Sequence, residues 1–224
     1  MPMQVLVIEN AASAPIALFG DWLRDQGATL TIVGPEAVPE TPEGYDLVVT
    51  LGSANGAYED LPWINRQRDF LRAAADANQP IVAICFGAQL LASAIGGKVA
   101  HLGDRRFVGW HDNETVGDPV WAGPWLRWHE DHLEVPDTAE VLARDQGTVQ
   151  AYQYRRAVGV QFHPEAGEAQ VARWSAAREA KWTHEAGMTV DGLVAQSRDL
   201  LESGAAARNA LFAEMLRRAM GRPA

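Results

Sequence analysis

The chain contains one cysteine, Cys85, and a His-Pro-Glu run at residues 163–165, which together supply a thiol, an imidazole and a carboxylate. These groups form nucleophilic triads, in which the imidazole activates the nucleophile and the carboxylate orients the imidazole. Cys85 follows the apolar run Ile81–Ile84 and precedes a helical pattern from Gly87 to Ile95. A strand-to-helix turn lifts a nucleophile clear of the sheet, and the helix dipole favours the thiolate. We therefore predict that Cys85 cleaves an amide bond through a thioester.

The neighbours of Cys85 fit such a crowded turn. Ala83 and Gly87 are small residues two positions on either side, and the N–H of Phe86 would stabilise an oxyanion. An unpaired cysteine is nevertheless more often a buried core residue than a nucleophile. The turn by itself leaves both interpretations open, so the second motif has to decide between them.

The second motif is His163-Pro164-Glu165, at the end of an apolar strand pattern. Residues two positions apart in an extended chain project to one face, and proline forces the residue before it into the extended region. Glu165 would therefore lie beside His163, so that His163 acts as base to Cys85 and as acid to the leaving amine. The alternative is a turn that caps the strand, with Glu165 beginning a helix. That alternative does not explain why the pair occurs together with the turn at Cys85.

Strand and helix patterns alternate through the first hundred residues, which predicts an α/β fold with a doubly wound, mostly parallel, flavodoxin-like sheet. The expected strands are 5–8, 29–33, 46–50 and 80–84, and the expected helices are 16–26, 63–77 and 87–95. The next short β-like stretches would add antiparallel strands to one edge of the sheet. They are 107–109, 126–129, 140–143, 149–154 and 158–163.

Beyond Glu165 the pattern is helical. We expect residues 1–166 to form one domain and residues 167–224 to form a C-terminal helical extension packed on it. The last helix carries an apolar face that includes Leu211, Phe212 and Met215. Such a face would cover the sheet, form a homodimer or contact a partner, and the sequence does not choose among these.

Composition excludes several classes of function. Lys and Arg total 19 against 29 for Asp and Glu, a formal charge of −10, which disfavours nucleic-acid binding. No apolar run approaches the length of a membrane span, and residues 1–9 lack the basic region of a signal peptide. A single cysteine forms no internal disulfide, so we expect a reducing compartment and a cytoplasmic location.

Two segments together carry a family resemblance. Ala83–Gln89 (AICFGAQ) and Gln161–Glu165 (QFHPE) resemble the motifs of the class I, or triad, glutamine amidotransferases. The resemblance covers about residues 3–166 and is strongest to stand-alone members similar to the glutaminase domain of GMP synthase. Thr50–Ala54 also resembles the Gly-Gly-Pro oxyanion loop of the family. Arg127–Leu133 resembles its His-Gly-Asp segment, which lines the glutamine pocket.

The resemblance implies a catalytic triad of Cys85, His163 and Glu165, with the oxyanion held by the N–H groups of Ser53 and Phe86. The substrate-binding residues that it implies are Gly52, Gln89, His129, Glu130 and Asp131. The sequence departs from the family pattern at three positions in these motifs. Ser53 and Ala54 replace glycine and proline, and serine would carry a steric cost if the loop needs a positive φ there. Glu130 replaces a glycine, which would narrow the pocket or favour a substrate that bears an amine.

Three functions remain open. The leading hypothesis is a glutaminase that passes ammonia to a separate synthetase, since the sequence has no Gly-rich phosphate loop and we expect no cofactor. The second is a self-sufficient γ-glutamyl hydrolase or peptidase with a larger pocket. The third is a regulatory or binding subunit with little turnover. We expect no metal, because His129, Asp131 and His132 lack a second ligand cluster. Half of the eight tryptophans lie between Trp110 and Trp128, where we expect mainly packing roles and, less often, contact with an acceptor or partner.

Overall fold

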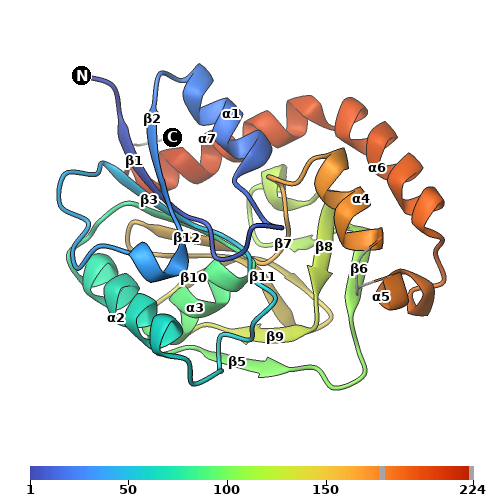
Figure 1. Ribbon diagram of the computed structural model, residues 1–224, viewed down its shortest axis with the longest axis horizontal. Helices are drawn as coiled ribbons and strands as arrows, with labels where there is room; N and C mark the ends of the chain where they lie inside the picture. Colours follow the sequence, from blue (N-terminus) through green and yellow to red (C-terminus); the bar gives the residue numbers. More distant parts are fainter. Residues whose placement is uncertain (177–179, 222–224) are drawn as a thin grey trace.

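A large sheet organises the computed structural model, which describes residues 1–176 and 180–221. Its strands follow the order β2, β1, β3, β4, β12, β11, β10, β7 (Figure 1). In that order they span Thr29–Val33, Gln4–Ile8, Leu47–Thr50, Ile81–Ile84, Ala157–Val160, Thr148–Tyr154, Glu140–Asp145 and Glu114–Thr115. The first five strands are parallel to one another, and the pairs from β12–β11 onward are antiparallel. The predicted doubly wound, mostly parallel sheet with an antiparallel edge is confirmed.

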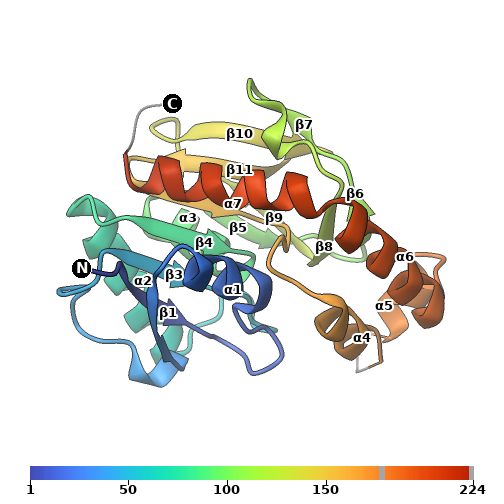
Figure 2. The same cartoon turned by 90° about the horizontal axis from the view of Figure 1, so that it is seen from above.

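Helices cover both faces of this sheet, because its central strands carry apolar side chains on both faces. In β1, Val5 and Val7 point into one core, whereas Leu6 and Ile8 point into the other. Continuous apolar strands of this kind are stable only when both faces are buried. The helices on the first face are α1 (Ala17–Asp25) and α7 (Ala205–Ala219), and those on the second are α2 (Pro62–Asp76) and α3 (Phe86–Ala94) (Figure 2).

Three of the expected edge strands lie elsewhere. The stretch expected at 158–163 is β12, which ends at Val160 and pairs in parallel with β4 inside the sheet. All four of its residues are buried, as a strand covered on both faces requires. The stretches at 107–109 and 126–129 become β6 (Phe107–His111) and β8 (Trp125–His129), which form a separate antiparallel ribbon. A second ribbon joins β5 (Lys98–His101) to β9 (Asp131–Glu134).

The helices after residue 166 were predicted and are present. Those before α7 are α4 (Glu168–Ala176), α5 (Ala180–Glu185) and α6 (Val190–Ser203). A cluster that joins Val108, Leu126 and Trp128 of the β6–β8 ribbon to Val171 and Leu193 packs these helices against the ribbon (Figure 1). The division of the chain at residue 166 stays a prediction. Two short 3-10 turns, Pro35–Ala37 and Pro119–Trp121, complete the described elements. Within the described ranges, no helix has the length and apolar character of a membrane span.

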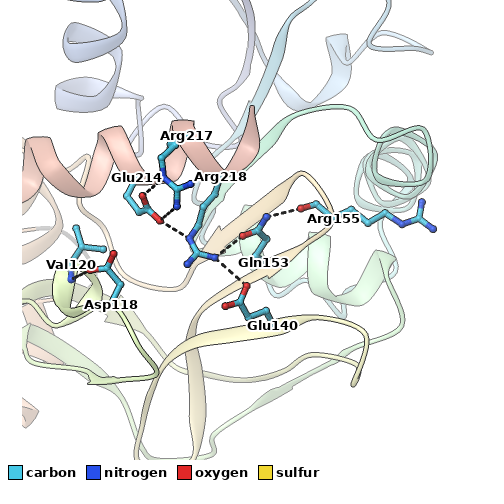
Figure 3. Close-up of polar contacts among 8 residues, drawn as sticks. All are labelled: Asp118, Val120, Glu140, Gln153, Arg155, Glu214, Arg217 and Arg218. Atoms are coloured by element: carbon cyan, nitrogen blue, oxygen red, sulfur yellow. Dashed lines mark hydrogen bonds and ion pairs between the residues drawn. The ribbon is translucent and has the colours of Figure 1, made fainter. Parts of the chain in front are cut away.

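Polar contacts tie the end of α7 to the antiparallel edge of the sheet (Figure 3). Arg218 donates to Glu140 at 3.1 Å and to Gln153 at 2.7 Å. Glu214 accepts from Arg217 and Arg218, and these bonds lower the pKa of its carboxyl although burial opposes them. Helix α7 is thus fixed by its apolar face to the core and by its last two turns to β10 and β11.

Candidate active site

Cys85 sits on a strained turn between β4 and α3. Its backbone has φ 53° and ψ −113°, a region that residues with a Cβ rarely adopt. Such strain costs about 1–3 kcal/mol and persists only where neighbouring structure holds it. Here the N–H of Cys85 donates to the carbonyl of Val160 at 2.8 Å, and the N–H of Gly87 donates to that of Leu51 at 3.1 Å. The turn expected from the sequence is therefore held between β12 and the end of β3.

Gly87 is the position on this turn that a side chain would disturb most directly. A Cβ there would lie 2.4 Å from the carbonyl oxygen of Thr50, closer than any real contact. We expect Gly87→Ala to lower the free energy of unfolding by about 1–3 kcal/mol, because backbone must move to admit the methyl group. Urea denaturation measures the change. Gly34→Ala is the control, since nothing lies within 4 Å of its Cβ position. Equal stability of the two variants would contradict this account of the turn.

His163 and Glu165 lie side by side beyond the end of β12. Nδ1 of His163 is 2.8 Å from Oε1 of Glu165, and the two residues are only 3% and 0% exposed. The backbone N–H of His163 donates to the carbonyl of Leu126 at 2.8 Å, which fixes the segment against β8. Cε1 of His163 and Cβ of Cys85 lie 3.4 Å and 3.9 Å from the position that a Cβ on Gly52 would occupy, so the two side chains are neighbours. The structure thus brings the three predicted catalytic residues together, with a hydrogen bond between His163 and Glu165.

The charges on either side of His163 control its proton. Burial alone would lower its pKa, but the negative charges of Cys85 and Glu165, with the hydrogen bond to Glu165, outweigh burial and raise the pKa to about 10. An imidazolium is therefore favoured at neutral pH when the thiol is ionised. This arrangement suits a histidine that must hold a proton until a leaving group needs it.

The loop after β3 lies against this pair. A Cβ on Gly52 would be 3.4 Å from Cε1 of His163, so the loop is in contact with the imidazole. Ser53 has no positive φ, and the steric cost considered for serine at this position does not arise. Its hydroxyl accepts from the N–H of Asn55 and donates to the Asn55 side chain, each at 3.2 Å. The Phe86 side chain packs against Trp63, which leaves only its backbone N–H, in the first turn of α3, beside Cys85.

A cavity of about 310 Å³ opens in front of Cys85 and His163. All the predicted substrate-binding residues line it, together with Ser53; they are Gly52, Gln89, His129, Glu130 and Asp131. Glu165 is not among the lining residues and is reached only through His163. The predicted segments therefore meet at one cavity, and the roles of the individual residues stay predictions.

Asp131 places an incompletely paired carboxylate in the cavity wall. Its Oδ2 accepts from the Gln89 amide at 3.2 Å, and the same amide donates to Gln161 at 3.2 Å. Its Oδ1 is buried without a hydrogen-bond partner among the described residues. Burial raises the pKa of Asp131, and the Gln89 hydrogen bond only partly offsets this. A cationic ligand at this wall would supply the missing partner.

His129 and Glu130 contribute differently to the same wall. Burial, assisted by the charge of Arg127, lowers the pKa of His129 to about 3, so its ring is neutral. Its Nδ1 lies 3.2 Å from the carbonyl of Asp131 and its ring stacks on Phe107. Glu130 is held by Arg106 at 3.1 Å and lies 3.3 Å from the His101 ring. The extra carboxylate is thus directed toward Arg106 rather than left unpaired.

Several cavity residues were not predicted. Tyr58 and Glu59 follow the loop after β3, Arg106 precedes β6, and Trp174 and Trp182 come from α4 and α5. Gln161 belongs to the second motif, and its amide lies 3.8 Å from the Cys85 sulfur. Tyr58 and Glu59 lie only a few residues after the loop motif Thr50–Ala54, and this closeness is the sequence signal that could have found them. The two tryptophans carry no local signal, because only packing of the C-terminal helices brings them to the cavity. Of the four tryptophans singled out, Trp121 and Trp125 are core residues and Trp128 lines the cavity.

The residues once considered for a metal do not converge. His132 lies 3.1 Å from Glu134 on β9, on a partly exposed face, whereas His129 and Asp131 face the cavity. Among the residues that the structure describes, no group of three or more His, Cys, Asp or Glu side chains is arranged to hold a metal ion.

A family model and several known proteins match this chain. The family model for glutamine amidotransferase class-I matches residues 7–171. Gamma-glutamyl peptidase 4 of Arabidopsis thaliana is 31% identical over 144 residues, 57% of this chain and 56% of that protein. The glutamine-hydrolysing GMP synthase of Mycolicibacterium paratuberculosis is 34% identical over 102 residues, 42% of this chain and 19% of the synthase.

One solved structure agrees over the whole chain. The crystal structure of a glutamine amidotransferase from Methylobacillus flagellatus superposes with a TM-score of 0.85 at 20% identity, covering 100% of this chain and 96% of that one. At this identity the likeness concerns the fold. The matched region is little more than half of the plant peptidase, 56%, and less of the synthase, 19%.

Proposed function

This chain belongs to the glutamine amidotransferase class-I family, and we propose that it hydrolyses γ-glutamyl amides, glutamine being the simplest, through a thioester on Cys85. The observation that carries the proposal is that Cys85 and His163 line one cavity, with the Glu165 carboxylate hydrogen-bonded to the far side of the imidazole. A buried carboxylate behind a histidine holds the imidazole in one tautomer and stabilises its protonated form. A sulfur on the other side of that imidazole is the nucleophile that this arrangement serves.

The reaction would proceed in two halves. The Cys85 thiolate attacks the amide carbon, and the N–H groups of Ser53 and Phe86 hold the oxyanion that develops. His163 gives its proton to the leaving nitrogen, the C–N bond breaks and a thioester remains. The neutral imidazole then takes a proton from water, whose oxygen attacks the thioester. Breakage of the C–S bond restores the thiolate and the imidazolium, and the glutamyl group leaves as a carboxylic acid.

The amino-acid end of the substrate would lie against Asp131. Its buried Oδ1 lacks a partner among the described residues, and the α-ammonium group of a γ-glutamyl compound would provide one. Gln89, which donates to the other oxygen of Asp131, would keep the carboxylate in position. The ammonium would also keep Asp131 ionised against the effect of burial.

With glutamine, the amine released is ammonia. The similarity to GMP synthases, which carry both a glutamine-hydrolysing and a synthetic activity in their name, supports a partner enzyme that consumes it. The similarity to γ-glutamyl peptidases supports a second candidate, in which the chain acts alone on larger γ-glutamyl amides. The specific observation in favour of the second is the set of tryptophans around the cavity, which ammonia would not need.

Purified protein incubated with glutamine tests the chemistry. We expect equal amounts of glutamate and ammonia, and a γ-glutamyl adduct on Cys85 that mass spectrometry detects after rapid acid quenching. Hydroxylamine should intercept the adduct as γ-glutamyl hydroxamate, since a thioester is open to amine attack. Absence of both product and adduct, with glutamine and with γ-glutamyl methylamide, would refute the proposed hydrolysis and favour a binding or regulatory role.

A further inference from the structure

Three tryptophans form a continuous wall on one side of the active-site cavity. Trp128 lies on β8, Trp174 on α4 and Trp182 on α5, and all three line the cavity. The ring centres of Trp128 and Trp174 are 5.9 Å apart, and those of Trp128 and Trp182 are 6.1 Å apart. We propose that this wall, called here the indole wall, is a leaving-amine subsite that selects γ-glutamyl amides of amines bearing an aromatic ring. The inference rests on the proposed thioester chemistry.

The position of the indole wall follows from the route of the proton. His163 must reach the leaving nitrogen, so the leaving amine lies beside the imidazole during C–N cleavage. The ring of His163 packs against Trp174, with centres 4.8 Å apart. From Trp174 the wall continues through Trp128 to Trp182. A substituent on the leaving nitrogen can therefore follow the indole wall, while the γ-glutamyl part lies toward Gln89 and Asp131.

Two of the three indoles are held in place by burial, which favours recognition of a flat ring. Trp128 and Trp174 are only 8% and 7% exposed, and the Trp174 indole N–H donates to the carbonyl of Ser13 at 2.9 Å. Side chains that are already ordered lose little entropy when a ligand binds. Aromatic rings packed on such a surface gain stacking or edge-to-face contacts beyond simple burial.

The charges at the far end of the indole wall favour a neutral amine substituent. Arg106 lies over Trp182, 5.3 Å from the ring centre. Its guanidinium is bonded to Glu130 at 3.1 Å and to Glu185 at 2.6 Å. An anionic substituent would gain little from Arg106, because Glu130 and Glu185 already balance its charge. A cationic substituent would have to displace Arg106 from these two carboxylates. A neutral ring meets neither obstacle.

The cavity volume supports a substrate larger than glutamine. About 310 Å³ is within the range that pockets for drug-sized ligands occupy. When glutamine is cleaved the leaving group is ammonia, which leaves the indole wall without contacts. Binding energy gained along the wall would therefore distinguish substituted amides from glutamine.

Two uncharged amides test the proposal in the wild-type protein. We expect kcat/KM for γ-glutamyl benzylamide to exceed that for γ-glutamyl methylamide by about 10- to 100-fold, the range that contacts of one hydrophobic group supply. γ-Glutamyl glycine and γ-glutamyl ethylenediamine, with anionic and cationic leaving groups, should resemble the methylamide. Equal rates for benzylamide and methylamide, or the highest rate for either charged amide, would overturn the inference and leave the proposed hydrolysis standing. Failure of every amide would instead refute the proposed function.

A pair of variants places the selectivity on the wall. Trp182→Leu removes the last ring of the wall and should lower the ratio of benzylamide to methylamide kcat/KM, and an unchanged ratio would place the selectivity elsewhere. Trp22→Leu is the matched control, because Trp22 on α1 packs against Phe19 and against Phe212 of α7 and is not among the cavity residues. Its ratio should stay at the wild-type value. Circular dichroism confirms folding of both.

If Trp182→Leu fails to fold, the same comparison is made with benzylamine and methylamine as product inhibitors of the wild-type enzyme. Benzylamine should then inhibit at least tenfold more strongly, and equal inhibition would contradict the subsite.

Discussion

Cys85→Ala should lose γ-glutamyl amide hydrolysis by a factor of about 10⁴–10⁶ in kcat, the loss seen when the nucleophile of a triad is removed. The hydroxyls of Ser13 and Ser53 also line the cavity, but an alcohol ionises far less readily than a thiol and is a weaker nucleophile in its place. Ammonia release in a coupled assay, followed for hours at high enzyme concentration, measures the residual rate. A variant that keeps a tenth of the activity would eliminate the thioester mechanism.

Stability separates chemistry from folding in this experiment. The Cys85 backbone is strained at φ 53°, and glycine adopts such angles without a Cβ clash. We therefore expect Cys85→Gly to be as inactive as Cys85→Ala but at least as stable as the Ala variant in urea denaturation, since it relieves strain of about 1–3 kcal/mol. If the glycine variant is markedly less stable than the alanine variant, the turn is not under the strain that its angles indicate.

Glu165→Gln should lower kcat/KM by about 10²–10⁴, the range over which loss of the acidic partner affects a triad. The neutral amide cannot stabilise the imidazolium, and its NH₂ group can force the wrong tautomer on His163. In the wild-type enzyme the activity should decline as pH rises through about 10, where His163 loses its proton. Because the negative charge of Glu165 helps to raise that pKa, the decline in the variant should move to lower pH.

Steady-state kinetics between pH 6 and about 11 would measure the decline in activity of the wild-type enzyme and of Glu165→Gln, because this range spans the raised pKa of His163. Glu168→Gln is the control, since Glu168 lies three residues further on and is paired with Arg198 at the surface. It should leave both the rate and the position of the decline unchanged. An unshifted decline in Glu165→Gln would mean that Glu165 does not control the proton of His163.

The fold could be predicted where the local pattern was unambiguous. Continuous apolar strands such as Val5–Ile8 and Ile81–Ile84 permit only burial on both faces, and the helical spacing between them leaves one α/β architecture. The positions of the later strands, such as β12, β6 and β8, could not be predicted from the residues within each strand. Ala157–Val160 is also continuously apolar, yet only its parallel pairing with β4 shows that it is an interior strand. The β6–β8 ribbon leaves the main sheet because helices that follow in sequence provide its packing surface.

The residues of the candidate site also fall into two groups, those that a local sequence motif predicts and those that only the packing of distant segments places. Cys85, His163 and Glu165 were predicted because each lies in a short segment whose spacing carries chemical meaning. Their meeting requires only that β4 and β12 end at the same edge of the sheet. Trp174 and Trp182 could not be placed beforehand, since their positions depend on how α4 and α5 dock on the β6–β8 ribbon. Arg106 is similar, because its bond to Glu185 joins segments 79 positions apart.

The position of α7 has a consequence for how the protein is made. This helix covers the face of the sheet that carries Val5 and Val7, and Arg156, next to β12, donates to the carbonyls of Ala219 and Met220. On the ribosome the strands emerge well before α7. Until the helix has been synthesised, that face is bare apolar surface, which invites aggregation or chaperone binding. The strand that leads to His163 is therefore secured only after α7 has been synthesised, well after the strand itself.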